Sequence, residues 1–442
     1  MVHVAGRGRR AGSVRALRVV LGGSVLAGSL VVGGGALVAA GPAGAQPPNN
    51  CPVTAPATAA QNASTTGITN HSVTVGNVSI ISGPVPGLFQ GASIGAKAYF
   101  DYVNSKGGVY GRKLLVDAKD DAFSGSQNQT ETADAVASDF ALVGSFSLFD
   151  GYGCKTLAAD QAVPDVSVTL DPSAGALPNN FSADPTVLGS SLGPWQYYKK
   201  HYPKDMNLGT IVSDTASAEA QLNGALAAAK SVGYKSVYVD DINPLQSDFT
   251  TDVINMRNKG VNAVDLTGVD WQDAAIFVQN AATQNWHPGL IFSGGPVYAD
   301  QFISHAGGPA VADGIMIGQV FPLYLGEDQS QLPADKLFLK YTKQVSSSWV
   351  PDLYTLFGWA SANLFVQALH AAGPHPTRGS VTAQLEKITN FDANGMVSPT
   401  NPAQKKPSGC FMMATIKNGK FVRVMPKTGF DCNTSYYYAP SS

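Results

Sequence analysis

The chain has 442 residues, of which 44% are hydrophobic and 14% are charged, and its formal net charge at pH 7 is −2. A chain of this length and composition buries a large core. A disordered or fibrous protein is therefore excluded, and two or three domains are expected. The lack of a basic surplus argues against a nucleic-acid partner.

The first 45 residues have the organisation of an export signal. Five arginines precede an apolar run over residues 19–40, and Ala43-Gly44-Ala45 follows as an A-x-A cleavage site. We predict a signal peptide over residues 1–45, removed after Ala45. An uncleaved membrane anchor is the alternative, because about 20 apolar residues can span a bilayer. The pair Arg9-Arg10 leaves the export route open. Removing five of the 29 basic residues leaves 24 against 31 acidic ones, a net charge of −7.

The mature chain keeps four cysteines, Cys51, Cys154, Cys410 and Cys432, and none of them forms a C-x-x-C pair. An even number of cysteines in an exported protein favours two disulfides over metal or redox chemistry. Pro48-Asn49-Asn50 precedes Cys51 and differs from the small, apolar residues of a lipoprotein cleavage site. Lipid anchoring through Cys51 is therefore not expected.

Residues 46–70 form an N-terminal extension, and the first predicted strand covers residues 73–81. Residues 95–121 then predict the first β-α-β unit of a doubly wound domain. Small and apolar side chains recur at helical spacing from Ile94 onward, and Gly107-Gly108 supplies the left-handed residues that end a helix. An apolar strand over residues 112–117 runs into Asp120-Asp121, at the carboxyl edge where open α/β sheets place ligands.

Short apolar strands alternate with amphipathic helices over most of the remaining chain. Further strands are predicted at residues 140–145, 165–170, 208–212, 236–239, 263–267, 290–293 and 314–317. Helices are predicted at residues 130–137, 216–232, 248–258, 272–284 and 354–372. This alternation favours parallel sheets with helices on both faces. Residues 410–416 and 421–425 depart from it, because the Asn418-Gly419 turn between them is typical of an antiparallel hairpin.

The order of these segments resembles the type I periplasmic solute-binding proteins of the branched-chain amino-acid-binding (Leu/Ile/Val-binding) group, the exported receptors of ABC importers. The resemblance covers residues 70–426. The segments that carry it are Ile81-Ser82-Gly83-Pro84, residues 95–121, Pro164-Asp165-Val166 to Thr169, Asp248-Phe249 with residues 254–259, and the helix over residues 356–372. In this family Asp120-Asp121 is a recurring feature that shapes a loop.

The resemblance implies a two-lobed α/β fold in which each lobe is a doubly wound, mostly parallel sheet. Three hinge crossings are expected at residues 179–184, 319–323 and 398–408. The N-terminal lobe would comprise residues 71–183 and 322–400, and the C-terminal lobe residues 184–321 and 401–442. Disulfides within a lobe leave the hinge free to move, so we predict the pairs Cys51–Cys154 and Cys410–Cys432.

The resemblance also implies binding rather than catalysis. A small molecule would lie between the lobes, which close around it, and the membrane permease subunits of an ABC importer would select the closed form. The protein would be a monomer without a cofactor, periplasmic or extracellular, with membrane association through its N-terminal segment left open. A sensing or sequestering protein of the same fold is the alternative, because fold does not fix function.

The family's amino-acid pocket is only partly matched. Its Ser-rich, carboxylate-binding turn corresponds to residues 147–151, where Asp150 occupies the region of a binding hydroxyl, while Thr169 matches a second family contact. No aromatic side chain lies at residues 216–218, although Trp271 is a candidate for another family aromatic. Residues 296–298 contain no acid to meet an ammonium group.

Aspartates at strand ends and nearby aromatic side chains are therefore the candidates for ligand binding. The candidate residues are Phe89, Ser147, Phe149, Asp150, Thr169, Leu170, Asp171, Asp214, Asp270, Trp271 and Tyr298. Such a cleft favours an amine, a polyol or a hydroxylated aromatic over a simple anion. The alternative for each aspartate is a helix N-cap or a turn, and for Trp271 and Tyr298 it is core packing.

Catalytic and metal-binding motifs are weak. Residues 91–95 match the G-x-S-x-G pattern of serine hydrolases, but about nine residues separate Ser93 from the preceding strand, which places it in the first turn of a helix instead. A secreted serine esterase is thus only a minor alternative. The histidines lack metal-ligand spacing such as H-x-x-x-H.

Overall fold

The computed structural model describes residues 51, 55–185 and 190–438, which belong to one compact unit. The predicted signal peptide, residues 1–45, lies outside the described residues. Within these ranges, none of the helices combines the length and the apolar character that crossing a bilayer requires.

The first sheet has four parallel strands in the order β2-β1-β3-β4. They are β1 (Ser72–Ser79), β2 (Lys113–Asp120), β3 (Leu142–Val143) and β4 (Asp165–Val166). Val75 belongs to the core shared with α2 (Gln90–Asn104) and α13 (Leu353–Ala372), and Val78 to the core shared with α3 (Gly125–Ser138) and α4 (Asp150–Ala159). The two faces of this sheet are therefore both covered, which explains why its strands are apolar almost throughout.

The second sheet is larger, with the order β12-β11-β10-β9-β8-β6-β7. Its parallel strands are β6 (Asn207–Ser213), β7 (Lys235–Ile242), β8 (Ala263–Gly268), β9 (Leu290–Ser293) and β10 (Met316–Gln319). The antiparallel hairpin β11 (Cys410–Lys417) and β12 (Lys420–Met425) extends it, and β13 (Asp431–Cys432) pairs with β11. Asn418 and Gly419 have φ of +52° and +68°, as the predicted Asn-Gly turn requires.

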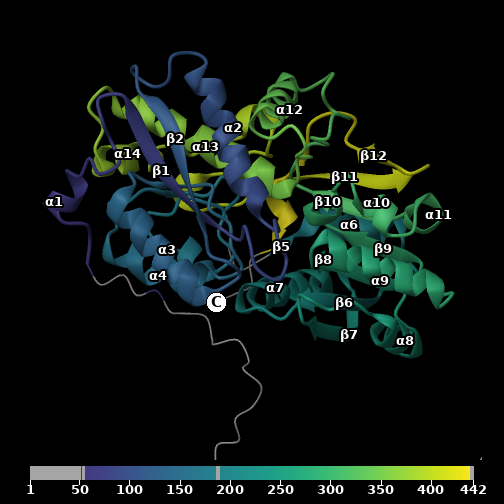
Figure 1. Ribbon diagram of the computed structural model, residues 1–442. Coiled ribbons are helices and arrows are strands. Elements are labelled where there is room, and N and C mark those ends of the chain that lie inside the picture. The colour runs from purple at the N-terminus through teal and green to yellow at the C-terminus, as the bar shows by residue number, and fades with distance from the viewer. Residues whose placement is uncertain (1–50, 52–54, 186–189, 439–442) are drawn as a thin grey trace, which may run out of the picture. The chain divides into compact units, whose positions relative to one another are not determined.

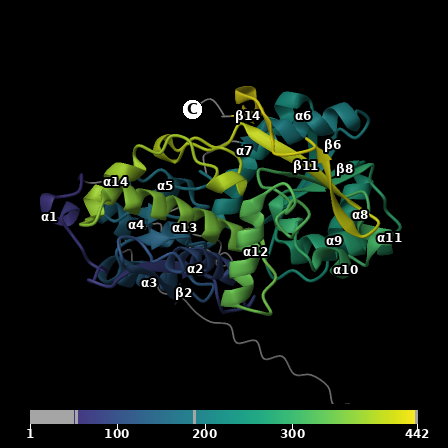
Figure 2. The same ribbon diagram turned by 90° about the horizontal axis from the view of Figure 1, so that it is seen from above.

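Most helices of the second half pack around this second sheet (Figures 1 and 2). They are α6 (Leu192–His201), α7 (Ala216–Val232), α8 (Thr250–Asn258), α9 (Trp271–Thr283), α10 (Phe302–His305) and α11 (Pro309–Ala312). By contrast, α12 (Pro333–Val345), α13 and α14 (Arg378–Leu385) return to the first sheet, beside α2 (Figure 1). We call the first sheet with its helices the first lobe, and the second sheet with its helices the second lobe.

The remaining elements are short. They are α1 (Ala59–Asn62), α5 (Pro172–Gly175), and the pair of two-residue strands β5 (Ser190–Ser191) and β14 (Tyr437–Tyr438). The chain passes between the sheets three times, after β4, after β10 and before β11. The crossing segments are hydrogen-bonded to one another, since Ser398 N donates to Val320 O and Thr400 Oγ1 donates to Ala183 O.

The G-x-S-x-G motif lies in α2, with Ser93 in the predicted first turn. The Ser93 hydroxyl donates to the Gln90 carbonyl oxygen. A Cβ atom on Gly95 would clash with the Thr355 carbonyl of α13, and one on Gly358 would clash with the Ala92 carbonyl. These glycines therefore serve the close crossing of α2 and α13.

Both disulfides lie within a lobe. Cys51 is bonded to Cys154 of α4, with 5.8 Å between their Cα atoms, and Cys410 of β11 is bonded to Cys432 of β13. This is the pairing that the family resemblance implies. Neither bond joins the first lobe to the second.

Candidate functional site

A cavity of about 400 Å³ lies between the two lobes, and we call it the interlobe cavity. The first lobe contributes the loops after β1, β3 and β4 and the N-terminal end of α13. The second lobe contributes α7 and the carboxyl-terminal ends of β6, β8, β9 and β10. The position agrees with the general rule that open α/β sheets bind ligands at the carboxyl ends of their strands.

The first-lobe wall of the cavity is aromatic. Phe89 and Phe146 meet edge to face with their ring centroids 4.8 Å apart, and Tyr354 lies 4.4 Å from the Phe89 ring and 5.0 Å from the Phe146 ring. Phe357 stacks on Phe146 at 5.5 Å and contacts Phe321 at 5.3 Å. These rings hold one another in place, so the wall presents a preformed apolar surface to a ligand.

The second-lobe wall is more polar. Thr210 of β6 and Asp265 of β8 are register partners on adjacent strands, and both line the cavity. Burial raises the pKa of Asp265, although hydrogen bonds from the Thr267 side chain and backbone partly offset this. Gln319 at the end of β10 is only 4% exposed, and its Nε2 donates to the carbonyls of Phe321 and Pro322. Its Oε1 is buried and accepts no hydrogen bond from the described residues.

Asp270 brings a carboxyl group to the cavity at the N-terminus of α9. Its Oδ1 accepts hydrogen bonds from the backbone of Gln272 at 2.7 Å and of Asp273 at 3.0 Å. Burial raises the pKa of Asp270, and the two backbone N–H groups partly offset this effect. Burial and the charge of Asp270 together raise the pKa of Asp273 to about 8. The two carboxyl groups therefore disfavour simultaneous ionisation.

Asp184 lines the cavity from the first crossing segment. Burial alone raises the pKa of its carboxyl to about 7. Tyr354 lines the opposite wall, and burial followed by the charges of Asp270 and Asp352 raises the pKa of its hydroxyl well above the ordinary value. That hydroxyl therefore stays neutral and remains available as a hydrogen-bond donor or acceptor.

Within the described residues, a hydrogen bond joins the two lobes across the cavity. Gln221 of α7 donates through Nε2 to the carbonyl oxygen of Leu170 at 3.4 Å, and both residues line the cavity.

Three of the eleven residues predicted from the sequence line the interlobe cavity, namely Phe89, Leu170 and Asp270. Phe89 belongs to the aromatic wall, Leu170 lies in the loop after β4, and Asp270 is the N-cap of α9. Their roles toward a ligand stay predictions.

Other predicted polar residues fix the loops of the first lobe. Asp150 accepts hydrogen bonds from the backbone of Leu170 at 2.6 Å and of Asp171 at 3.1 Å. Burial raises the pKa of Asp150 to about 7, against the effect of the Leu170 N–H. Asp171 caps α5, and Ser147 donates to Asp121. Ser147 and Asp150 line, together with Thr169, a neighbouring cavity of about 30 Å³ rather than the larger one.

The remaining predicted residues lie outside the cavity lining. Asp214 is exposed at the end of β6. Phe149 packs against Phe123, and Trp271 meets His305 edge to face at 5.1 Å. Tyr298 is fully buried, where its hydroxyl donates to Glu327.

The Asp120-Asp121 pair shapes a loop, as the family resemblance implies. Burial by itself raises the pKa of Asp120, but hydrogen bonds from Ser82, Ala122 and Ile81 outweigh it and lower the pKa. Asp121 accepts from Asn128 at 3.0 Å and from Phe123 N at 3.1 Å. Neither residue lines the interlobe cavity.

Several cavity residues were not among the candidates. They are Phe146, Asp184, Thr210, Gln221, Asp265, Gln319, Tyr354 and Phe357. Two signals could have pointed to some of them. Asp184 and Gln319 fall in the predicted hinge crossings, and Tyr354 and Phe357 lie one turn apart at the start of a predicted helix.

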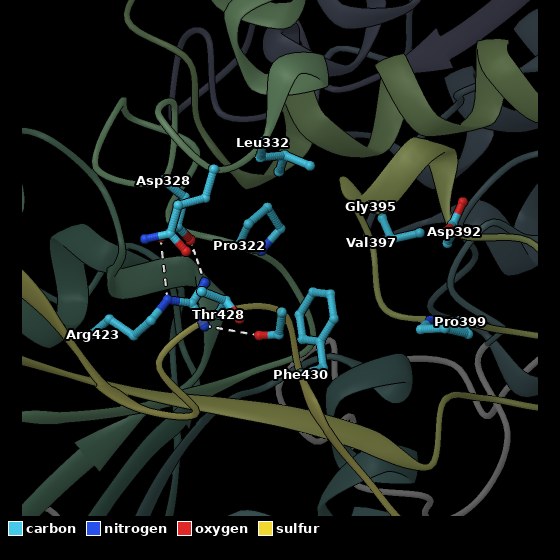
Figure 3. Close-up of a pocket in the computed structure, with 12 residues that line it drawn as sticks. Pro322, Asp328, Leu332, Asp392, Gly395, Val397, Pro399, Arg423, Thr428 and Phe430 are labelled. Carbon is cyan, nitrogen blue, oxygen red and sulfur yellow. Dashed lines mark hydrogen bonds and ion pairs between the residues drawn. The ribbon is translucent and has the colours of Figure 1, made fainter.

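A second cavity of about 230 Å³ lies beside the crossing segments and is lined by Pro322, Leu332, Val397 and Phe430, among others (Figure 3). Its charged groups already have partners. Arg423 forms a two-pronged ion pair with Asp328 and donates to the carbonyl oxygens of Pro426 and Gly429. Across the described ranges, no three His, Cys, Asp or Glu side chains are arranged to hold a metal ion.

Comparison with known proteins supports the same fold. The family model described as periplasmic binding protein matches residues 72–420. A curated relative, Leu/Ile/Val-binding protein homolog 8 of Brucella abortus (strain 2308), is 26% identical over 319 residues, which cover 68% of this chain and 76% of the relative. Homolog 1 of Brucella suis is 26% identical over 314 residues and covers 68% and 80%.

Solved structures share the architecture at low sequence identity. A fatty acid ABC transporter substrate-binding protein from Thermomonospora curvata has a TM-score of 0.69 at 18% identity, covering 84% of this chain and 94% of that one. A branched chain amino acid ABC transporter protein from Thermus thermophilus with bound valine has a TM-score of 0.69 at 16% identity, covering 84% and 98%. A solute binding protein from R. palustris in complex with benzoate has a TM-score of 0.65 at 18% identity, covering 82% and 98%.

The resemblance drawn from the sequence is thereby confirmed, and the two sheets match the two lobes of the type I fold. Because the family model spans most of its length, the chain belongs to the periplasmic binding protein family.

Proposed function

We propose that this protein is an extracytoplasmic solute-binding receptor of an ABC importer. It encloses one small molecule in the interlobe cavity and presents the closed form to the permease subunits. The observation that carries the proposal is the cavity itself, about 400 Å³ at the carboxyl ends of two sheets joined by three crossing segments. The hinge would lie at residues 179–184, 319–323 and 398–408. The family consists of solute-binding proteins, and we propose binding without catalysis here as well.

The cavity favours a ligand with a substantial apolar body. Its volume lies within the range of about 300–1,000 Å³ typical of sites for drug-sized molecules. The aromatic wall and side chains such as those of Val212, Leu222 and Val269 line it, and the lining as a whole is mostly apolar. Relatives of the same fold carry names that mention fatty acids, valine and benzoate, so the fold accommodates diverse apolar groups.

A thermal-shift screen of the mature protein tests the proposal. The solutes are amino acids, amines, polyols, aromatic acids and fatty acids. A solute at 100 times its Kd stabilises the folded state by about 2.7 kcal/mol. The Ala225→Trp substitution would fill the cavity from α7 and should abolish the shift. The matched control is Ala118→Trp on the exposed face of β2. This variant should keep the thermal shift of the wild type. Undiminished binding by Ala225→Trp, or no stabilising solute at all, would contradict the proposal.

A solute-uptake assay distinguishes a transport receptor from a sensor or sequestering protein of the same fold. Uptake of the labelled solute should fall when the gene is deleted and recover with the wild type, but not with Ala225→Trp. Uptake that is unchanged by the deletion would favour the alternative.

A further inference from the structure

We propose that the ligand is an amphipathic amine, with an apolar body, a protonated nitrogen and no carboxylate. This inference rests on the proposed function, because it concerns the same cavity. It follows from which hydrogen-bonding groups of the cavity walls are already paired and which are still available.

Two groups of backbone donors at the ends of the cavity walls are already paired with carboxylates of the chain itself. In the first lobe, Asp150 accepts from the N–H groups of Leu170 and Asp171, at the loop after β4. In the second lobe, Asp270 accepts from the N–H groups of Gln272 and Asp273, at the N-terminus of α9. A helix N-terminus is a natural anion site, and here a side chain occupies it. A ligand carboxylate would have to displace one of these contacts.

The charged side chains that line the cavity are all acidic. Asp184, Asp265 and Asp270 contribute three carboxyl groups, whereas none of the described residues that line the cavity is Lys, Arg or His. An anionic ligand would oppose the ionisation of these carboxyl groups, whose pKa burial already raises, and would meet no compensating cation among them. A cationic ligand would find several partners there.

Unpaired hydrogen-bond acceptors in the cavity also favour a ligand that carries N–H donors. Gln319 is 4% exposed, and its Oε1 has no hydrogen-bond donor among the described residues, because its Nε2 is held by two backbone carbonyls. Only Oδ1 of Asp270 is engaged by the backbone, which leaves Oδ2 for a donor outside the described chain. A protonated amine supplies the two or three donors that this wall requires.

The opposite wall suits the rest of such a molecule. The rings of Phe146, Tyr354 and Phe357 line the cavity together, and the charge of Asp270 acts on Tyr354. Aromatic faces attract cations as well as apolar groups, at about 0.5–2 kcal/mol per contact. The apolar body would lie against these rings, and the nitrogen would lie toward Asp270.

Matched series of solutes test the inference by isothermal titration calorimetry. Each series keeps one apolar skeleton (benzyl, phenethyl, cyclohexylmethyl, isobutyl or hexyl) and varies the head group among amine, alcohol, carboxylate and α-amino acid. For every skeleton that binds, the amine should bind at least tenfold more tightly than the carboxylate. A carboxylate or an amino acid as the tightest binder would overturn the inference and leave the receptor intact. Binding of no member, while another solute of the thermal-shift screen binds, would likewise overturn the inference and leave the receptor intact.

Asp270→Asn then tests the role of the carboxyl. Asparagine is as good an N-cap as aspartate, so α9 should be retained while the negative charge is lost. Amine affinity should fall at least tenfold, and the affinity of the matched alcohol should change less than twofold. Asp248→Asn is the control, because exposed Asp248 likewise accepts from a backbone N–H two residues on, outside this cavity. Asp184→Asn provides a second variant. Unchanged amine affinity in both Asp270→Asn and Asp184→Asn would overturn the inference.

Discussion

Asp335 is a fully buried carboxyl in the first turn of α12. Both of its oxygens are without a hydrogen-bond donor among the described residues, and the charges of Asp328 and Glu327 act on it. Burial, reinforced by these two carboxylates, raises its pKa to about 8. A raised pKa means that the folded chain binds one proton more than the unfolded chain between about pH 4 and pH 8.

The stability contributed by protonated Asp335 is therefore complete below about pH 4 and is lost as the pH rises to 8. Asp335→Asn removes this dependence. We expect the variant to exceed the wild type by about 2–4 kcal/mol in the free energy of unfolding at pH 8, and by much less at pH 5. Urea unfolding of both proteins at pH 5 and pH 8 measures this difference in the free energy of unfolding. Equal pH dependence in both proteins would contradict the assignment.

Individual residues also show where sequence reasoning stops. Asp150, Asp171 and Asp270 were all predicted at strand ends. They lie instead at helix starts that follow β3, β4 and β8: Asp150 begins α4, and Asp171 and Asp270 are the N-caps of α5 and α9. What the sequence could not show is the partner of each carboxyl, because a backbone N–H donor is chemically the same at every position. Only the folded loops reveal that Asp150 accepts from Leu170 while Asp270 also faces the interlobe cavity.

At the scale of elements, the crossing of α2 and α13 depends on small residues. A Cβ on Gly95 would overlap the Thr355 carbonyl, which is backbone and cannot rotate away. Gly95→Ala should therefore force the helices apart and cost about 2–3 kcal/mol, despite the better helix propensity of alanine. Lys97→Ala, on the exposed face of α2, is the control and should change stability by less than about 0.5 kcal/mol. Denaturant titration measures the free energy of unfolding of both variants. If Gly95→Ala loses no more stability than the control, the close contact of α2 with α13 at Gly95 is refuted.

Helix α4 shows why some elements escape prediction. Its sequence contains Gly151 and Gly153, which lower helix propensity. In the structure a Cβ on Gly153 would overlap Thr132 of α3, and one on Gly151 would overlap Asp171. Tertiary packing therefore requires glycine at the two positions where glycine lowers the helix propensity of the sequence. By contrast, α7 was predicted with its full bounds, because it is rich in alanine, the residue with the highest helix propensity.

At the scale of the whole molecule, the family resemblance supplied the two lobes and the three crossings, and the position of the cavity followed from them. Most of the cavity residues could not be predicted in the same way. Phe89 and Tyr354 are far apart in sequence and meet only because α13 returns to the first sheet. Gln221 and Leu170 come from different lobes, so no local pattern joins them.

The central claim is that the interlobe cavity holds an amphipathic amine, and a crystal structure of the complex tests it most directly. The complex should contain the tightest-binding amine of the matched series. The account predicts that its nitrogen lies within hydrogen-bond distance of Asp270 and that its apolar body lies against Phe146 and Phe357. A ligand bound outside this cavity would contradict the account, as would an amine whose nitrogen contacts none of Asp184, Asp265 and Asp270.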